Sequence, residues 1–189
     1  MKPSYILKIK IIAFALSLFL GAPLLAAPAP ATSTSALIAT ELGLFRSHLG
    51  FKIDAADTDW ELIPSPKNHP FVITQFMSPN SFKNIHASLT VRREKLIKKQ
   101  KLSQYVKKWL NQYPRFGFDV TGSKKFKIKG HQGYVIDVTS RDRKKQLRQV
   151  VYLKKKDAFV LTCRDHKENF KNSLKACNKI IRSFEWTTE

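Results

Sequence analysis

The chain contains two cysteines, Cys163 and Cys177, and their spacing can be tested against three kinds of chemistry. A redox site usually has its two cysteines two residues apart at the start of a helix, and a zinc site needs about four ligands at short spacings. Thirteen residues lie between this pair, so neither pattern is present. The spacing favours a structural disulfide between Cys163 and Cys177, with two free buried thiols as the alternative.

The other candidate metal ligands are scattered along the chain. No histidine has a partner at the i+4 spacing of helical ligands; the five are His48, His69, His86, His131 and His166. Acidic residues crowd one turn, at Asp54, Asp57, Asp59 and Glu61, without the glycine and distal glutamate of a calcium loop. We therefore expect no metal and no cofactor, and interpret these groups as solvated surface residues.

The sequence also lacks the common catalytic motifs. It has no G-x-S-x-G nucleophile elbow, no G-x-G-x-x-G and no P-loop, and no base stands beside a nucleophile. We expect no catalytic residues and no enzymatic activity.

The first residues have the order of a secretory signal peptide. Lys2, Lys8 and Lys10 precede an apolar run over residues 11–20, after which Gly21 and Pro23 interrupt the pattern. The run is about half the length that a spanning helix needs, which disfavours the alternative of an uncleaved anchor. We predict a signal peptide over residues 1–26, with cleavage as late as residue 31, and a flexible linker over 27–40. The domain would then cover 41–189 and have no transmembrane segment. It would be periplasmic or secreted, which places it in an oxidising compartment where cysteines pair.

The charge is strongly positive, with 34 Lys and Arg against 14 Asp and Glu and a net charge of +20. Two basic runs are expected to form a binding face on loops. The first is Arg141, Arg143, Lys144, Lys145 and Arg148, and the second is Lys154, Lys155 and Lys156. Further basic residues lie at 92–101 and 124–129. Such a field favours an acidic protein or an anionic envelope component as partner, with a generic solvated face as the alternative. Nucleic acid is disfavoured as a partner because export separates the protein from the nucleic acid of the cell. The exposed aromatic residues that alternate with basic residues in single-strand binders are also missing.

Hydrophobic periodicity predicts the elements that would position these residues. Strands are expected at 49–53, 71–77, 87–93, 126–129, 133–139, 147–153 and 158–163. Short polar links join the last three, which indicates an antiparallel meander. One helix is expected from Ser103 to Pro114 and another after Asp165 as N-cap. Its apolar stripe includes Cys177, so that thiol would face the sheet that carries Cys163. The fold class is α+β, an antiparallel sheet flanked by helices in an αβα sandwich.

Three stretches resemble the Mog/PsbP-like family. Residues 49–53 with Trp60 resemble its opening "gFsi…P…W" segment, residues 128–134 its "i.G..gy" strand entry, and residues 180–184 its terminal "i..SF" signature. The span from Leu49 to Trp186 covers most of the domain. The chain departs from the pattern where the acidic DAADTD replaces the proline before the tryptophan.

The resemblance implies a PsbP-like domain of the secreted bacterial branch that acts as a small non-enzymatic binding or accessory module. Better-known members are extrinsic subunits of photosynthetic complexes and a Ran-binding import factor. We expect the basic loops to dock an acidic protein or an anionic envelope surface. The alternative is a small-ligand-binding or hydrolase-like domain with a pocket between the sheet and the first helix, lined by Trp109 and Tyr113.

Overall fold

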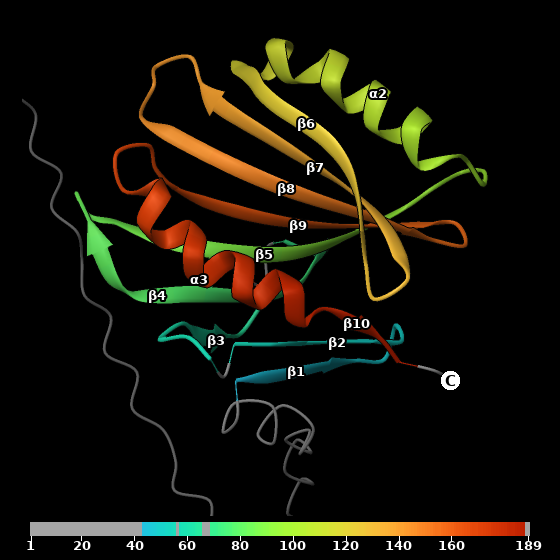
Figure 1. The fold of residues 1–189 in the computed structure, drawn as a ribbon, viewed down its shortest axis with the longest axis horizontal. Helices are drawn as coiled ribbons and strands as arrows, with labels where there is room; N and C mark the ends of the chain where they lie inside the picture. The colour runs from blue at the N-terminus through green and yellow to red at the C-terminus, as the bar shows by residue number, and fades with distance from the viewer. Residues whose placement is uncertain (1–42, 56, 66–68, 188–189) are drawn as a thin grey trace, which may run out of the picture. The chain divides into compact units, whose positions relative to one another are not determined.

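A computed structural model describes residues 43–55, 57–65 and 69–187. The predicted signal peptide (1–26), the predicted linker (27–40) and the predicted start of the domain at residue 41 all lie outside these residues. The described part contains two antiparallel sheets and two α-helices (Figure 1). The expected α+β class is therefore confirmed.

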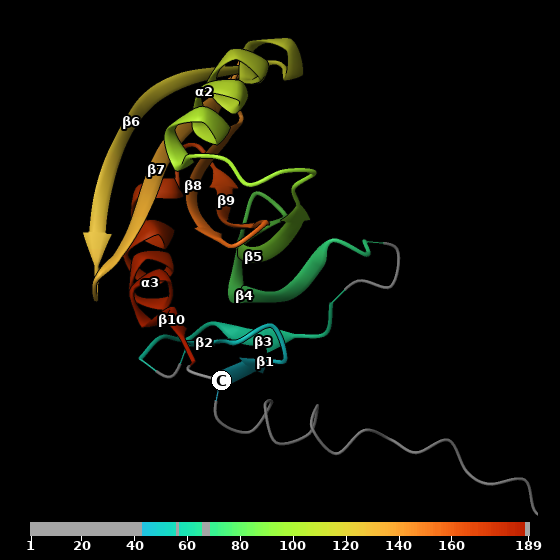
Figure 2. The ribbon, with the colours of Figure 1, turned by 90° about the vertical axis from the view of Figure 1, so that its right-hand side faces the viewer.

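The larger sheet has seven strands in the order β3-β4-β5-β9-β8-β7-β6. Their bounds are β3 Glu61–Ile63, β4 Val72–Phe82, β5 Ile85–Lys95, β6 Phe118–Ile128, β7 His131–Ser140, β8 Lys145–Lys154 and β9 Asp157–His166. Every neighbouring pair is antiparallel. β7 to β9 follow one another as the predicted meander, and β6 extends it by one strand. β6 is an edge strand that curves strongly along the sheet (Figure 2).

Helices cover opposite faces of this sheet. Successive residues of a strand point to opposite faces, and on β8 Val150 and Tyr152 belong to the core with α3 Phe170–Ser183, whereas Val151 belongs to the core with α2 Leu102–Gln112. Pro114 ends α2, because it cannot continue the hydrogen bonding of an α-helix, and the 3₁₀ turn η1 Tyr113–Phe116 follows. This arrangement is the expected αβα sandwich.

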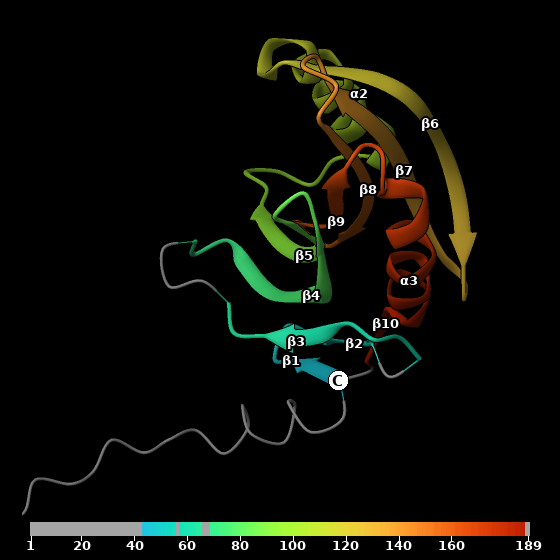
Figure 3. The same ribbon diagram turned by 90° about the vertical axis from the view of Figure 1, so that its left-hand side faces the viewer.

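A smaller sheet, in the order β1-β2-β10, joins the two ends of the described chain. It consists of β1 Leu44–Ser47, β2 Phe51–Asp54 and β10 Glu185–Trp186. α3 leads directly into β10, which pairs with β2 (Figure 3). Phe51 of β2 lies within 5.2 Å of the ring of Phe184 and 5.6 Å of that of Phe159, measured between centroids, so the small sheet contributes to the core under α3.

Several predicted boundaries are wrong. Leu49 and Gly50 lie in the turn before β2, and the strands β1, β3 and β10 and residues 118–125 of β6 were not predicted. Asp165 does not cap the last helix. It is the ninth residue of β9, fully buried and opposite Gln146 of β8, and Asn169 occupies the N-cap. The strand continues to His166 because β8 supplies a partner to its end.

Candidate binding surface

The two predicted basic turns lie at opposite ends of β8. The β7–β8 turn precedes the first residue of β8 and the β8–β9 turn follows its last residue. A strand of that length is about 30 Å long, since each residue adds about 3.3 Å. A rigid partner therefore contacts only one of the two turns, unless its surface is as long as β8.

The β7–β8 turn carries its own counter-charges. Arg141 Nε lies 3.6 Å from Asp119 Oδ1. The carboxylate of Asp142 accepts hydrogen bonds from the Ser140 hydroxyl and from the backbone N–H of Lys144. These bonds hold the pKa of the Asp142 carboxyl below its usual value. The positive field of this turn is partly offset by these two acids.

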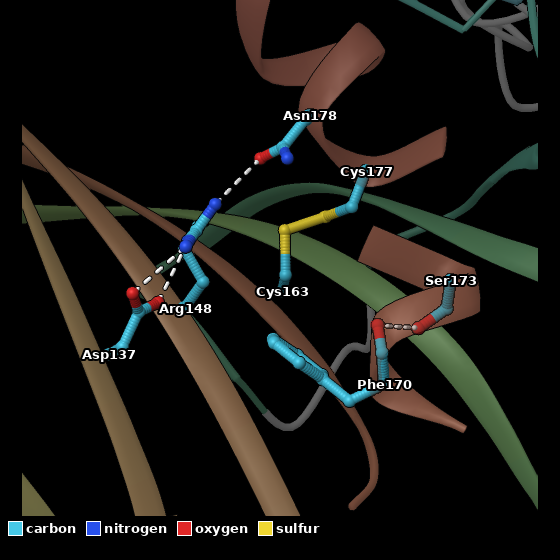
Figure 4. Close-up of a disulfide and its surroundings, with 7 residues drawn as sticks. All are labelled: Asp137, Arg148, Cys163, Phe170, Ser173, Cys177 and Asn178. Carbon is cyan, nitrogen blue, oxygen red and sulfur yellow. Dashed lines mark hydrogen bonds and ion pairs between the residues drawn. A yellow bond between two sulfur atoms is a disulfide. The ribbon is translucent and has the colours of Figure 1, made fainter. Parts of the chain in front are cut away.

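Arg148, which was predicted to lie on the first basic loop, instead lies within β8 (Figure 4). Its Nε and Nη2 donate to the two carboxylate oxygens of Asp137 at 2.7 and 2.9 Å. Its Nη1 donates to Asn178 Oδ1 of α3 at 3.4 Å. The hydrogen bonds that Arg148 donates to the Asp137 carboxylate raise the pKa of this guanidinium. Arg148 therefore connects β7, β8 and α3, and this role removes it from the predicted binding loop.

The predicted disulfide is confirmed in the same region. Cys163 of β9 and Cys177 of α3 are bonded, with their Cα atoms 6.3 Å apart (Figure 4). That separation is within the ordinary range for disulfides. Both residues are buried at 1% exposure. The bond connects the last helix to a strand in the middle of the sheet.

At the other end of β8, Lys154 is also partly engaged. Its Nζ donates to the carbonyl of Gly50 at 3.3 Å and lies 4.8 Å from the centroid of the Trp186 ring. Lys155 and Lys156 are exposed. The carbonyl of Lys156 accepts a hydrogen bond of 2.7 Å from the N–H of Leu96, which follows β5.

That hydrogen bond brings two basic segments together. β5 ends where β9 begins, with Lys95 opposite Asp157, so the segment 95–101 lies beside the β8–β9 turn. We call the exposed lysines of this end of the sheet the basic end: Lys95, Lys98, Lys99, Lys101, Lys125, Lys127, Lys155 and Lys156. The sequence showed each run separately but contained no signal of their proximity, because it depends on the order of strands in the sheet.

The acidic side chains next to the basic end are already bound. Glu94 Oε2 accepts a hydrogen bond of 2.6 Å from the Tyr105 hydroxyl. Arg93 donates to both carboxylate oxygens of Asp157 at 3.0 Å. In the described part of the chain, no ion pair to a carboxylate engages any lysine of the basic end. Their charges therefore remain available to an external anion.

A hollow of about 490 Å³ forms part of this end. It lies between the start of α2 and strands β6 and β7 and is lined by Lys101, Leu102, Ser103, Lys125, Phe126, Lys127, Gln132 and Gly133. Lys125 and Lys127 are two residues apart on one strand, so they point to the same face. The lining thus includes three lysines and no carboxylate.

The predicted pocket beside Trp109 and Tyr113 differs from this hollow. Trp109 borders a small recess of about 200 Å³ with Phe71, Arg92, Arg93, Glu94 and Val160. Tyr113 is buried, and its hydroxyl donates to Gln149. Burial raises the pKa of Tyr113 to about 12. Tyr113 thus belongs to the core under α2 and does not line the recess.

Within the described residues, no three side chains of His, Cys, Asp or Glu are placed to hold a metal ion together. No helix in that part of the chain has both the length and the apolar character required to span a membrane.

No family model matches the chain, and no curated protein matches its sequence. The solved structures that are similar in fold include three from bacteria. A cyanobacterial PsbP from Synechocystis has a TM-score of 0.57 and 10% identity, over 85% of this chain and 98% of its own. The described domain has a PsbP-like fold.

The other two structures carry the same fold. A protein of unknown function from Pseudomonas aeruginosa, described as a putative regulator, has a TM-score of 0.55 and 18% identity over 78% of this chain and 99% of its own. LpqN of Mycobacterium tuberculosis, which is involved in cell envelope biogenesis, has a TM-score of 0.52 and 16% identity over 69% of this chain and 79% of its own. At these identities the comparison establishes the PsbP-like fold alone.

Proposed function

We propose that this PsbP-like protein is an exported, non-enzymatic accessory domain of the secreted bacterial branch, located in the periplasm or outside the cell. Its basic end docks an acidic protein or an anionic envelope component. The observation that carries the proposal is the group of exposed lysines brought together from three segments without carboxylate partners in the described part of the chain. The disulfide supports an oxidising compartment. Structural similarity to a PsbP and to a protein of envelope biogenesis is consistent with an accessory role.

The basic end is favoured over the β7–β8 turn because of its charge balance. Arg141 and Lys144 have Asp119 and Asp142 beside them, and Arg148 is bound to Asp137. A field from uncompensated lysines extends further than one from paired charges, and it raises encounter rates with anionic surfaces.

The test uses two variants with equal changes in charge. Lys155→Gln/Lys156→Gln removes two charges from the basic end, and Arg143→Gln/Lys144→Gln removes two from the opposite end of β8. Immobilised protein is exposed to a cell-envelope extract and eluted along a salt gradient. We expect a defined component to be retained above about 0.3 M salt, where exposed ion pairs alone are strongly screened. The first variant should release it at lower salt and the second should not. Equal effects of the two variants would contradict a localised site.

The hollow supports a second candidate, the binding of a small anionic ligand between the sheet and α2. Its volume is within the range of small-molecule sites. Pyrophosphate is a suitable probe. We expect it to raise the thermal unfolding temperature of the native protein and to have a smaller effect on Lys125→Gln/Lys127→Gln. No shift with the native protein would remove this candidate.

A further inference from the structure

The segment between β5 and α2 carries an apolar side chain with no protein around it. Ile97 is 100% exposed, although Leu96 beside it is buried. The segment extends beyond the end of β5 to a tip and turns back before α2 begins (Figure 2). Exposed single apolar residues are common on proteins, so exposure alone does not indicate a site.

The surroundings of Ile97 provide the second observation. Lys95, Lys98 and Lys99 are exposed on the same segment, and the hydrogen bond from Leu96 to Lys156 holds the β8–β9 turn against its base. The nearby acids Glu94 and Asp157 are bound to Tyr105 and Arg93. The tip therefore combines one apolar side chain with a surrounding group of free cations.

We propose that this tip binds an anionic lipid bilayer, with Ile97 inserted below the headgroups and the lysines placed among them. The proposal rests on the proposed function and specifies its partner. An apolar side chain that leaves water and lysines attracted to anionic headgroups both favour attachment to a membrane surface. Lysine side chains suit this position because their methylene stems lie along apolar surface while their ammonium groups remain with the headgroups.

A bilayer fits this tip better than an acidic protein does. The centre of a protein–protein interface is a packed patch enriched in aromatic residues and depleted in lysine. Here a single isoleucine is surrounded by lysines, and none of the described residues that flank it is aromatic. A fluid bilayer needs no complementary pocket for one inserted side chain.

The experiment measures binding to vesicles of phosphatidylcholine alone and of phosphatidylcholine with phosphatidylglycerol. The protein is used as the producing cell processes it, with its N-terminus determined by mass spectrometry. Ile97→Ser removes the anchor without changing the charge, and Phe116→Ser is the matched control, since Phe116 is 61% exposed at the other end of α2. Both variants should unfold at nearly the native temperature, because each side chain is largely in solvent.

We expect binding that requires phosphatidylglycerol and falls about tenfold in Ile97→Ser, because an inserted isoleucine loses its transfer from water. Phe116→Ser should bind as the native protein does. Lys98→Gln/Lys99→Gln should bind about 25-fold more weakly, at about fivefold for each lysine near the membrane surface. In Ile97→Trp, indole fluorescence should shift to the blue on addition of the mixed vesicles.

The other outcomes separate this inference from the proposed function. Vesicle binding that is equal in the native protein and Ile97→Ser would overturn insertion and leave an electrostatic surface. Binding to immobilised poly-glutamate without binding to vesicles would overturn the bilayer as partner while the proposed function stands. Binding to neither would refute both.

Discussion

Reducing the disulfide provides a direct measurement of how the last helix is held on the sheet. The chain contains two cysteines, so a reductant breaks this one bond and removes no buried side chain. Cys163 and Cys177 are 14 residues apart. In the chain-entropy model, opening a loop of that size returns conformational entropy to the unfolded chain and lowers its free energy by about 3 kcal/mol. For a domain of this size that corresponds to a decrease of about 10 °C in Tm.

The assay is urea unfolding with and without dithiothreitol, followed by circular dichroism, with free thiols counted by mass spectrometry. We expect a lower free energy of unfolding and an increased m-value in the reduced protein, because its unfolded chain is more expanded. Cys163→Ala/Cys177→Ala is the control and should not respond to the reductant. A loss below about 1 kcal/mol with both thiols free would refute the argument, since the crosslink would then hardly constrain the unfolded chain.

Two further predictions concern aromatic residues in the core or packed against it. In Gly133→Ala the new Cβ would lie 2.3 Å from Phe126 Cζ, so we expect a loss of about 1–3 kcal/mol in chemical unfolding; Gly122→Ala, whose Cβ would meet its nearest atom at 3.8 Å, should lose less. Burial raises the pKa of Tyr113 and Tyr152 to about 12, so both stay neutral in the folded protein at a pH where they ionise in the unfolded chain. Stability should be retained below pH 10 and decrease from pH 10 to 12 by about 1.4 kcal/mol per pH unit for each tyrosine. Tyr152→Phe should reduce that slope by one tyrosine's share in urea titrations, and an unchanged slope would show that its hydroxyl is solvated.

The sequence predicted those parts of the fold that depend on local patterns. The meander followed from short polar links between alternating runs, and the stripe on α3 placed Cys177 toward the strand that carries Cys163. Both are confirmed. The exposed first half of β6 was missed because an edge strand with one partner needs no regular alternation of apolar residues.

Prediction of the candidate surface was limited by strand order. The sequence grouped Arg148 with its basic neighbours, but Asp137, its partner, comes from the adjacent strand at the opposite position. Likewise, Lys98 and Lys155 are far apart along the chain, and their segments meet because β5 and β9 are neighbours. Composition predicts that a surface is basic, whereas tertiary pairing decides which charges remain free.

The small sheet affects when the domain can finish folding. β2 pairs with β10 through Lys52 and Glu185, and Asp54 and Ser183 are also hydrogen-bonded over nearly the same separation. A ribosome must therefore release almost the entire domain before this sheet can form. Contacts between such distant parts of a chain slow folding. For a protein exported as we propose, this sheet would close only after nearly the whole domain has crossed the membrane, in the compartment where the cysteines pair.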